Sequence, residues 1–441
     1  MNSGLQKYLS NTIWMVSGRM FKMFLGLLGT GIVARYLGPE RFGLLNYCFS
    51  LVSIALVAVV MGLEAVVVRE LVKFPNRRAE IMGSSLMVQC VGLLVAGILL
   101  TAFAYILKLD RESISLLVVG GISLIFRPLC IFRFYFEATV QANSIARLEF
   151  IYAFIGILLR IVLVYVNAPL VWFAFCLAME WIVMGIGFTV LYFRQCKVDH
   201  SYLSFSTRAA KALLNYSWPL LVSSATIILH QQIDKVMLKE LLGEIGNNQV
   251  GFYSAAVRFC IFVIFIPQMI AKSLTPALVS AFSRSQDEYR QRIALFMDVM
   301  NWTGIGLSLV LCILAKPLIM FTYGETYVSS ILILQIAAWK GFFSSTGMAS
   351  GRQSTIENLQ RYAYLRNLIG LVVNVFLNAY LIPRYQAIGA AYATVISMFA
   401  ANILSHLIIK PYWHIFKDQL QSIMLGWYRL PKYAFEAVRG G

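Results

Sequence analysis

Charged side chains are scarce in this sequence. Only 13% of its 441 residues are Asp, Glu, Lys or Arg, whereas hydrophobic residues make up 59% and the mean hydropathy is +0.74. A soluble globular chain carries about 25% charged residues. No polar stretch is long enough to form a sizeable soluble domain. The composition therefore excludes a soluble protein and predicts an all-α polytopic membrane protein.

Motifs for catalysis and metal binding are missing as well. The sequence has no H-E-x-x-H zinc motif, no G-x-x-x-x-G-K-[ST] phosphate loop and no D-x-D motif. Its seven cysteines include no C-x-x-C pair, and six of them lie in apolar runs, where cysteine usually acts as a small buried hydrophobe. We expect no catalytic residues, no metal, no cofactor and no ATP-driven pump.

Apolar runs of bilayer-crossing length predict about twelve transmembrane helices. The expected spans are residues 12–33, 43–68, 81–106, 113–136, 148–166, 170–193, 213–238, 249–271, 293–315, 328–349, 362–382 and 387–409, with a polar connector at 273–292. The predicted domains are an N-terminal six-helix bundle at 1–193, a cytoplasmic connector at 194–212, a C-terminal six-helix bundle at 213–410 and a basic interfacial tail at 411–441.

The basic residues are distributed unevenly between the two expected membrane faces. With the N-terminus inside, 22 of the 37 Lys and Arg residues lie on the inner side, 7 on the outer side and 8 within spans. Because basic loops favour the cytoplasm, both termini should be cytoplasmic. The net charge of +17 then reflects topology and attraction to anionic lipids, so a nucleic-acid partner is not needed.

Basic residues inside spans are the main candidates for function, because a charge there costs at least a few kcal/mol and normally faces a cavity or a partner. The eight are Arg19, Lys22, Arg127, Arg133, Arg160, Lys235, Arg258 and Lys340. Arg133 has Glu137 four residues later, which favours a structural ion pair. Pro128 should kink the span that holds Arg127 and Arg133.

Arg19 and Lys22 share one face of the first span with Gly26 and Gly29. This face is either a cavity wall that holds a phosphate or a helix-packing face with snorkelling cations. Arg19 lies about 10 Å into the span, which is deep for snorkelling and favours the cavity.

His230 and Asp234 are four residues apart on the seventh span. Such a pair at depth can couple transport to a proton gradient. In the alternative, the span ends early and Asp234 lies at the outer surface. Glu149 and Asp298 are near the inner ends of spans, where we expect them to be solvated.

The two halves of the sequence resemble each other in chain order. Asn11-Thr-Ile-Trp14 corresponds to Asn215-Tyr-Ser-Trp218, and Arg147 and Gly156 correspond to Arg361 and Gly370 at a constant offset of 214. Both halves begin on the same side, so the repeat is parallel and its axis runs along the membrane normal. Transporter bundles use this arrangement, which predicts a midplane cavity between two related bundles.

The stretch Val33-Ala-Arg-Tyr-Leu-Gly-Pro-Glu-Arg-Phe-Gly43 contains an L-G-x-x-x-[FY]-G hairpin and follows the span with Arg19. It resembles the opening of polysaccharide-type flippases, the O-antigen or teichoic-acid repeat-unit translocases. These belong to the superfamily of multidrug/oligosaccharidyl-lipid/polysaccharide exporters. The likeness extends over the whole chain, through the spans, the two halves, the connector and the basic tail.

The resemblance implies a V-shaped two-lobe bundle in the cytoplasmic (inner) membrane that moves undecaprenyl-pyrophosphate-linked oligosaccharide from the cytoplasmic to the periplasmic leaflet by alternating access. A proton or sodium gradient would drive it. The expected partners are the lipid-linked oligosaccharide, anionic lipids and other polysaccharide assembly proteins, and we expect the protein to work as a monomer. The residues expected to hold the pyrophosphate and any acidic sugar are Arg19, Lys22, Arg127, Arg160, Arg258 and Lys340.

Three alternatives carry less weight. A multidrug exporter for cationic drugs favours acids in its cavity, whereas here intramembrane cations outnumber acids by eight to about six. Lipid II flippases often have more than twelve spans. A membrane glycan polymerase or ligase usually needs a large outer loop, and the longest expected here is roughly a dozen residues. We therefore expect a transporter and not an enzyme.

Overall fold

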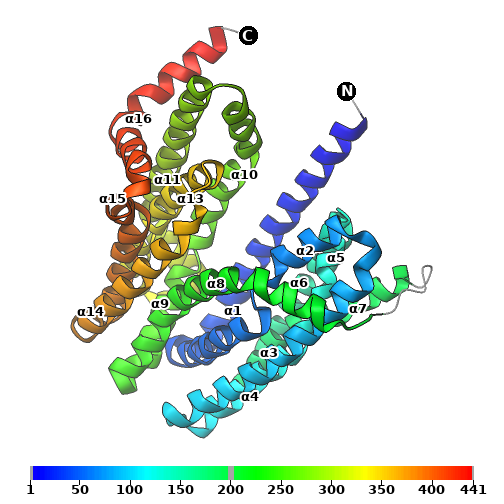
Figure 1. The fold of residues 1–441 in the computed structure, drawn as a ribbon. Coiled ribbons are helices and arrows are strands. Elements are labelled where there is room, and N and C mark those ends of the chain that lie inside the picture. The colour runs from blue at the N-terminus through cyan, green and yellow to red at the C-terminus, as the bar shows by residue number, and fades with distance from the viewer. Residues whose placement is uncertain (1–2, 197–202, 440–441) are drawn as a thin grey trace. The chain divides into compact units, whose positions relative to one another are not determined.

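The computed structural model describes the backbone of residues 3–196 and 203–439, with their side chains except those of 3–19, 142, 196 and 432–439. These residues form helices and no β-strand (Figure 1). Eight helical stretches among them are long and apolar enough to cross a membrane. The predicted all-α membrane fold is confirmed. Three stretches, of 54, 78 and 49 residues, exceed one crossing, and the count of twelve spans stays a prediction.

The chain divides into two compact units, Met1–Gln232 (unit 1) and Ile233–Gly441 (unit 2), and α8 (Thr207–Leu242) contributes to both. The other helices of unit 1 are α1 (Ser3–Val60), α2 (Leu63–Lys73), η1 (Pro75–Arg77), α3 (Arg78–Ile106), α4 (Arg111–Ile125), η2 (Pro128–Ile131), α5 (Phe132–Ala138), α6 (Ala142–Tyr165) and α7 (Leu170–Cys196). Those of unit 2 are η3 (Gly243–Ile245), α9 (Gly246–Val257), α10 (Cys260–Arg284), α11 (Gln286–Tyr323), η4 (Glu325–Tyr327), α12 (Ser330–Ala337), α13 (Lys340–Ile356), η5 (Gln360–Tyr362), α14 (Ala363–Phe399), η6 (Ala400–Leu404), α15 (Ser405–Ile408), η7 (Lys410–Tyr412) and α16 (Trp413–Arg439).

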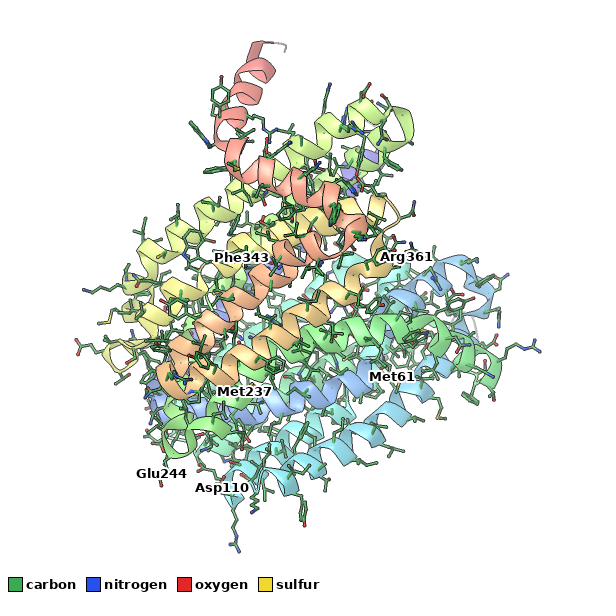
Figure 2. The ribbon with its side chains drawn as sticks, turned by 60° about the vertical axis from the view of Figure 1, so that its left-hand side comes forward. Met61, Asp110, Met237, Glu244, Phe343 and Arg361 are labelled. Atoms are coloured by element: carbon green, nitrogen blue, oxygen red, sulfur yellow. The ribbon has the colours of Figure 1, made fainter. Side chains whose placement is uncertain are left out.

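Local chemistry explains where several helices begin or turn. Gly38 interrupts α1 with φ 70 and ψ 171, a conformation that glycine adopts without steric cost, and it separates the first two predicted spans. Asp110 precedes α4 (Figure 2), and its side chain accepts a hydrogen bond from the Glu112 N–H at 3.2 Å. The kink predicted at Pro128 is confirmed, because this residue begins the 3₁₀ segment η2 between α4 and α5.

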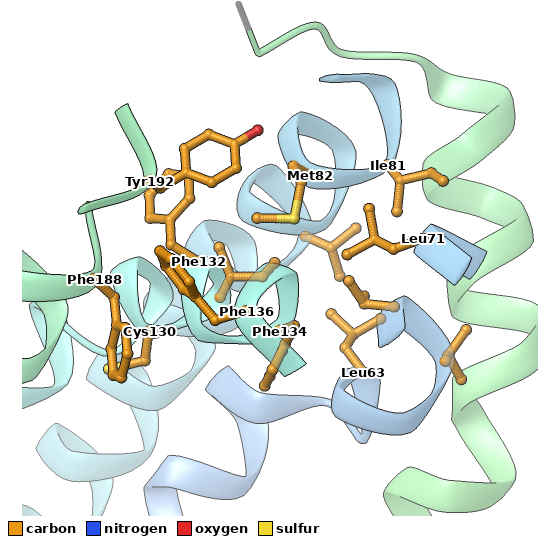
Figure 3. Close-up of a cluster of buried hydrophobic side chains, with 14 of the residues drawn as sticks. Leu63, Leu71, Ile81, Met82, Cys130, Phe132, Phe134, Phe136, Phe188 and Tyr192 are labelled. Atoms are coloured by element: carbon orange, nitrogen blue, oxygen red, sulfur yellow. The ribbon is translucent and has the colours of Figure 1, made fainter. Parts of the chain in front are cut away.

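An aromatic and aliphatic core holds unit 1 together (Figure 3). Phe132 and Phe136 of α5 pack with Phe188 and Tyr192 of α7, next to aliphatic side chains of α2 and α3 that include Leu63. Burying each of these side chains contributes about 1.5–3 kcal/mol. The cluster fixes the positions of α5 and α7, which flank the basic residues described below.

Unit 2 differs from the sequence-based expectation at two places. The polar stretch at 273–292 is helical up to Arg284, and α11 begins at Gln286. The expectation that Asp298 is solvated is wrong, because this residue is fully buried and its Oδ1 atom lies 2.9 Å from Arg429 Nη2. The physical reason is that α16 packs against α11 and covers this carboxylate.

Candidate functional site

Three basic residues lie where a helix inside a predicted span is interrupted. Arg127 falls between α4 and η2, Arg258 falls between α9 and α10, and Lys340 begins α13 just after α12 ends. The Arg127 N–H bonds to the Leu124 carbonyl at 3.0 Å, and i→i−3 bonds of the same type occur around Arg258 and Lys340. Tightened turns inside a helix often mark functional positions. The spans predicted at 113–136, 249–271 and 328–349 are thus each interrupted beside a cation.

Two of the basic residues predicted to bind substrate lie over aromatic rings of unit 1. Lys22 Nζ is 4.6 Å from the centroid of the Tyr152 ring on α6, and the Arg127 guanidinium is 3.9 Å from the Trp181 ring on α7. An aromatic face attracts a cation and still leaves its hydrogen-bond donors directed elsewhere. This environment holds the charges in place and can present them to an anion.

Arg160 has a partner that the sequence could not reveal. Its Nη2 atom lies 2.9 Å from Glu180 Oε1 on the neighbouring helix α7, and Arg160 is only 7% exposed. A Cβ atom at Gly29 of α1 would lie 2.9 Å from Arg160 Nη1, so this glycine admits the guanidinium. Arg160 therefore joins α1, α6 and α7, and its predicted contact with substrate stays a prediction.

The ion pair predicted between Arg133 and Glu137 is confirmed, with Arg133 Nε 2.9 Å from Glu137 Oε1. Arg133 Nη1 also lies 3.6 Å from Glu149 Oε1. Arg133 is thus a structural residue. The side chain of Arg19 lies outside the described residues, and its predicted role stays a prediction.

Asp234 is the centre of a polar cluster inside unit 2. It is 1% exposed, and its Oδ1 atom accepts hydrogen bonds from Asn374 Nδ2 at 3.0 Å and Asn378 Nδ2 at 2.7 Å. Its Oδ2 atom accepts hydrogen bonds from Thr394 Oγ1 at 2.6 Å and from the Tyr253 hydroxyl. Burial of a carboxylate is compensated here by four neutral donors. The alternative that placed Asp234 at the outer surface is wrong.

Three elements build this Asp234 cluster. Asp234 comes from α8, Tyr253 from α9, and the remaining donors from α14. The helical path of α14 is broken at Gln386, where φ is 52, so that Thr394 returns to the carboxylate already bonded by Asn374. His230 lies one turn before Asp234 on α8, and its role in coupling stays a prediction.

The four donors to Asp234 were missed in the sequence. They lie 19 to 160 residues from Asp234, so no local pattern connects them. One signal was available, because Asn374 and Asn378 are four residues apart within the span predicted at 362–382. Amides at this spacing share a helix face inside an otherwise apolar run.

Basic side chains adjoin the Asp234 cluster. Lys235 interacts electrostatically with Arg258, Lys340 and Asp234, and Lys340 Nζ lies 5.9 Å from the centroid of the Tyr253 ring. Unit 2 therefore brings together the predicted substrate residues Arg258 and Lys340 with the predicted coupling residue Asp234. Neighbouring positive charges repel one another, and a bound anion would relieve that repulsion.

Comparison with known proteins identifies the family of this chain. Residues 8–286 match the family described as "Polysaccharide biosynthesis protein". The chain belongs to this family. The match covers more than half of the chain and includes both the hairpin at Gly38 and the first basic residues of unit 2. It confirms the resemblance to polysaccharide-type transporters found in the sequence.

Relatives of the family are similar to this chain at low identity. A "Probable low-salt glycan biosynthesis flippase" of Haloferax volcanii is 23% identical over 48% of this chain, and the matched part spans only 44% of that relative. A "Putative O-antigen transporter" of Shigella flexneri is 20% identical over 87% of this chain and 93% of its own length. The solved structure of the lipid II flippase MurJ in an inward closed conformation has a TM-score of 0.69, with 17% identity over 94% of this chain and 92% of that chain.

The chain is thus a member of a polysaccharide biosynthesis family with helices long and apolar enough to cross a membrane, and the relatives and the solved structure named above are described as transporters or flippases. In the part of the chain that the structure describes, no group of three or more His, Cys, Asp or Glu side chains is arranged to hold a metal ion.

Proposed function

We propose that this protein is a flippase that moves undecaprenyl-pyrophosphate-linked oligosaccharide from the cytoplasmic to the periplasmic leaflet by alternating access. The observation that carries the proposal is the placement of Arg127, Arg258 and Lys340 at interruptions of helices. Interrupted helices recur around substrate sites of transporters. Cations held there are suited to a pyrophosphate that has to leave water to cross the bilayer.

The cations of the two units have different surroundings, which suggests different tasks. Arg160 is paired with Glu180, whereas Arg258 and Lys340 are both close enough to Lys235 to interact with it electrostatically. An anionic substrate gains most where cations repel one another, because binding removes that repulsion. We therefore place the pyrophosphate nearest to Arg258 and Lys340 of unit 2, and the contact of Lys22 and Arg127 of unit 1 with substrate stays a prediction.

The test is translocation of a lipid-linked oligosaccharide in vesicles that contain the purified protein. We expect Arg258→Gln and Lys340→Gln to lower the rate at least about tenfold, because each removes a charge-assisted contact. Lys410→Gln is the matched control, since Lys410 is an exposed basic residue of the same unit. Full activity of both variants would contradict the proposal, as would normal display of the glycan outside cells that lack the protein and any redundant flippase.

We further propose that a proton or sodium gradient drives transport through Asp234. The carboxylate can bind a proton, and the oxygens of Thr394, Tyr253 and Asn378 are ligands of the type that a small hard cation accepts. Asn378 Oδ1 is buried without a hydrogen-bond partner among the described residues, so it is one such oxygen.

Asp234→Asn keeps the size of the side chain but removes its charge. We expect this variant to lose the dependence of the transport rate on an imposed gradient while counterflow of substrate persists. Asp287→Asn is the control, because Asp287 is an exposed acid at the start of α11. Retention of gradient dependence in the Asp234 variant would contradict this coupling.

The second candidate is a lipid II flippase, favoured by the fold that the chain shares with MurJ. The same vesicle assay with lipid II in place of the oligosaccharide carrier separates the two candidates. We expect the larger rate with the oligosaccharide carrier.

A further inference from the structure

Unit 2 contains a pocket that the proposed transport site does not include. Its volume is about 570 Å³, and it lies between the second half of α10 and α13. The lining residues are Lys272, Thr275, Pro276, Val279 and Ser280 of α10 and Arg352 of α13. We call this the Lys272–Arg352 pocket.

Pro276 explains why a pocket forms beside α10. Pro276 lies inside α10 and has no N–H, so the Lys272 carbonyl lacks the helical hydrogen bond that it would otherwise accept. The Thr275 hydroxyl donates to the Ala271 carbonyl at 2.6 Å, one turn earlier. A proline inside a helix usually bends it and opens space beside its neighbour. The pocket lies directly beside this proline.

The polar part of the lining is cationic. It contains an ammonium group, a guanidinium group and the Ser280 hydroxyl, and no acid belongs to the lining among the residues that the structure describes. Arginine binds phosphate oxygens through two parallel N–H donors, and lysine adds a compact charge. This combination selects a phosphate group over a carboxamide or a neutral sugar.

The apolar part of the lining indicates what carries the phosphate. Pro276 and Val279 complete the pocket, and Val279 is 50% exposed. Leu274 and Phe282 on the same helix are also exposed, at 36% and 39%. A free phosphate ion makes no favourable contact with such an apolar surface, whereas an acyl or prenyl chain can cover it.

We propose that the Lys272–Arg352 pocket binds the phosphate group of an anionic amphiphile, whose apolar part lies along Pro276 and Val279. Two sources share this chemistry: the headgroup of a membrane phospholipid and the phosphate of a lipid-linked compound. The site is separate from Arg258 and Lys340, and the proposal does not depend on transport.

The experiment counts lipids bound to the full-length protein by native mass spectrometry. The probes are farnesyl pyrophosphate and dioctanoyl phosphatidylglycerol, and inorganic pyrophosphate is the comparator without an apolar part. We expect the double variant Lys272→Gln/Arg352→Gln to retain one amphiphile fewer than the wild-type protein, and each single variant to bind about tenfold more weakly at that site. Lys272→Arg should keep the bound amphiphile, and Lys410→Gln is the control outside the pocket.

Each outcome is decisive. Loss of phosphatidylglycerol alone in the double variant supports the pocket with a phospholipid headgroup, and loss of farnesyl pyrophosphate alone supports it with a lipid-linked phosphate. Equal retention of both probes in the wild-type protein and the double variant would overturn the site. Binding of inorganic pyrophosphate as tight as that of farnesyl pyrophosphate would overturn the role of the apolar part. Both substituted side chains are at least partly exposed, so the variants should fold.

Discussion

Two ion pairs fasten α16 to the rest of unit 2, and they differ in burial. Arg429 Nη2 lies 2.9 Å from Asp298 Oδ1, and these side chains are 25% and 0% exposed. His414 Nε2 bonds to Glu357 Oε2, with exposures of 50% and 16%. We therefore expect the first pair to affect the free energy of unfolding more strongly than the second, and the second pair to respond to pH.

Removing the partner of a buried acid should be costly. We expect Arg429→Ala to destabilise the protein by about 1–3 kcal/mol, because Asp298 is left buried without its cation. The measurement is the midpoint of thermal unfolding in detergent. Lys417→Ala is the control, because Lys417 is exposed on the same helix. Adding Asp298→Asn to the Arg429 variant should recover part of the loss, and an unchanged midpoint in Arg429→Ala would contradict the role of this pair.

The His414–Glu357 pair should loosen as the pH rises. The hydrogen bond to Glu357 raises the pKa of His414, so its contribution is complete below 6.5 and is lost as the pH rises through the raised pKa. Burial alone would raise the pKa of Glu357, but hydrogen bonds from His414, Gln353 and Tyr289 outweigh burial and lower it. Its contribution is therefore present above 4.5 and is lost as the pH falls through the lowered pKa.

This pH dependence is measurable by hydrogen exchange of the amides of residues 413–425. We expect their protection to be highest between about pH 4.5 and 6.5 and to fall above that range. His414→Gln should remove the loss on the alkaline side. Burial raises the pKa of Asp418, which accepts a hydrogen bond from Gln353. Asp418 is present in both the wild-type protein and the His414 variant. Identical profiles for the wild-type protein and the variant would exclude His414 as the responding group.

At the scale of elements, α14 turns sharply at Gln386, and the turn depends on a glycine. A Cβ atom at Gly389 would lie 2.4 Å from the Leu381 carbonyl oxygen, which belongs to the backbone and has little room to move. We expect Gly389→Val to force the two parts of α14 apart, to lower the unfolding midpoint and to abolish transport. Gly306→Val, where a Cβ atom meets nothing within 4 Å, is the control. Normal transport by the Gly389 variant would show that the turn tolerates a side chain.

The interruptions of helices show what a sequence can and cannot predict about elements. Pro128 predicted the interruption of the helix near Arg127, because proline lacks the N–H that a helical hydrogen bond needs. The break before Lys340 had no such signal. It is supported by contacts distant in sequence, because Cys260 Sγ donates to the Ala337 carbonyl at 3.3 Å and the Phe342 N–H bonds to Ser308 Oγ at 3.1 Å. Partners of this kind depend on tertiary packing and leave no local pattern.

At the scale of the whole molecule, the sequence predicted the fold class well and the site only in part. Composition and apolar run length are averages over many residues, so they survive local exceptions and give an all-α membrane protein. A buried cluster depends instead on a few pairs far apart in the chain. Asp234 was found because it lies four residues after His230 within a predicted span, whereas nothing at Thr394, 160 residues away, indicated that it bonds to this carboxylate.

Orientation in the membrane depends on the whole chain, because it follows from the number of basic residues on each side of the membrane. With 22 such residues on one side and 7 on the other, we expect both termini in the cytoplasm. Alkaline phosphatase, which is active only outside the cytoplasm, should be active when fused after Glu244 or Glu325 and inactive when fused after Ser285 or at Gly441. Green fluorescent protein at Gly441 should fluoresce. The reverse pattern would place the grouped cations of unit 2 at the opposite end of the transport path and would contradict the proposed direction of transport.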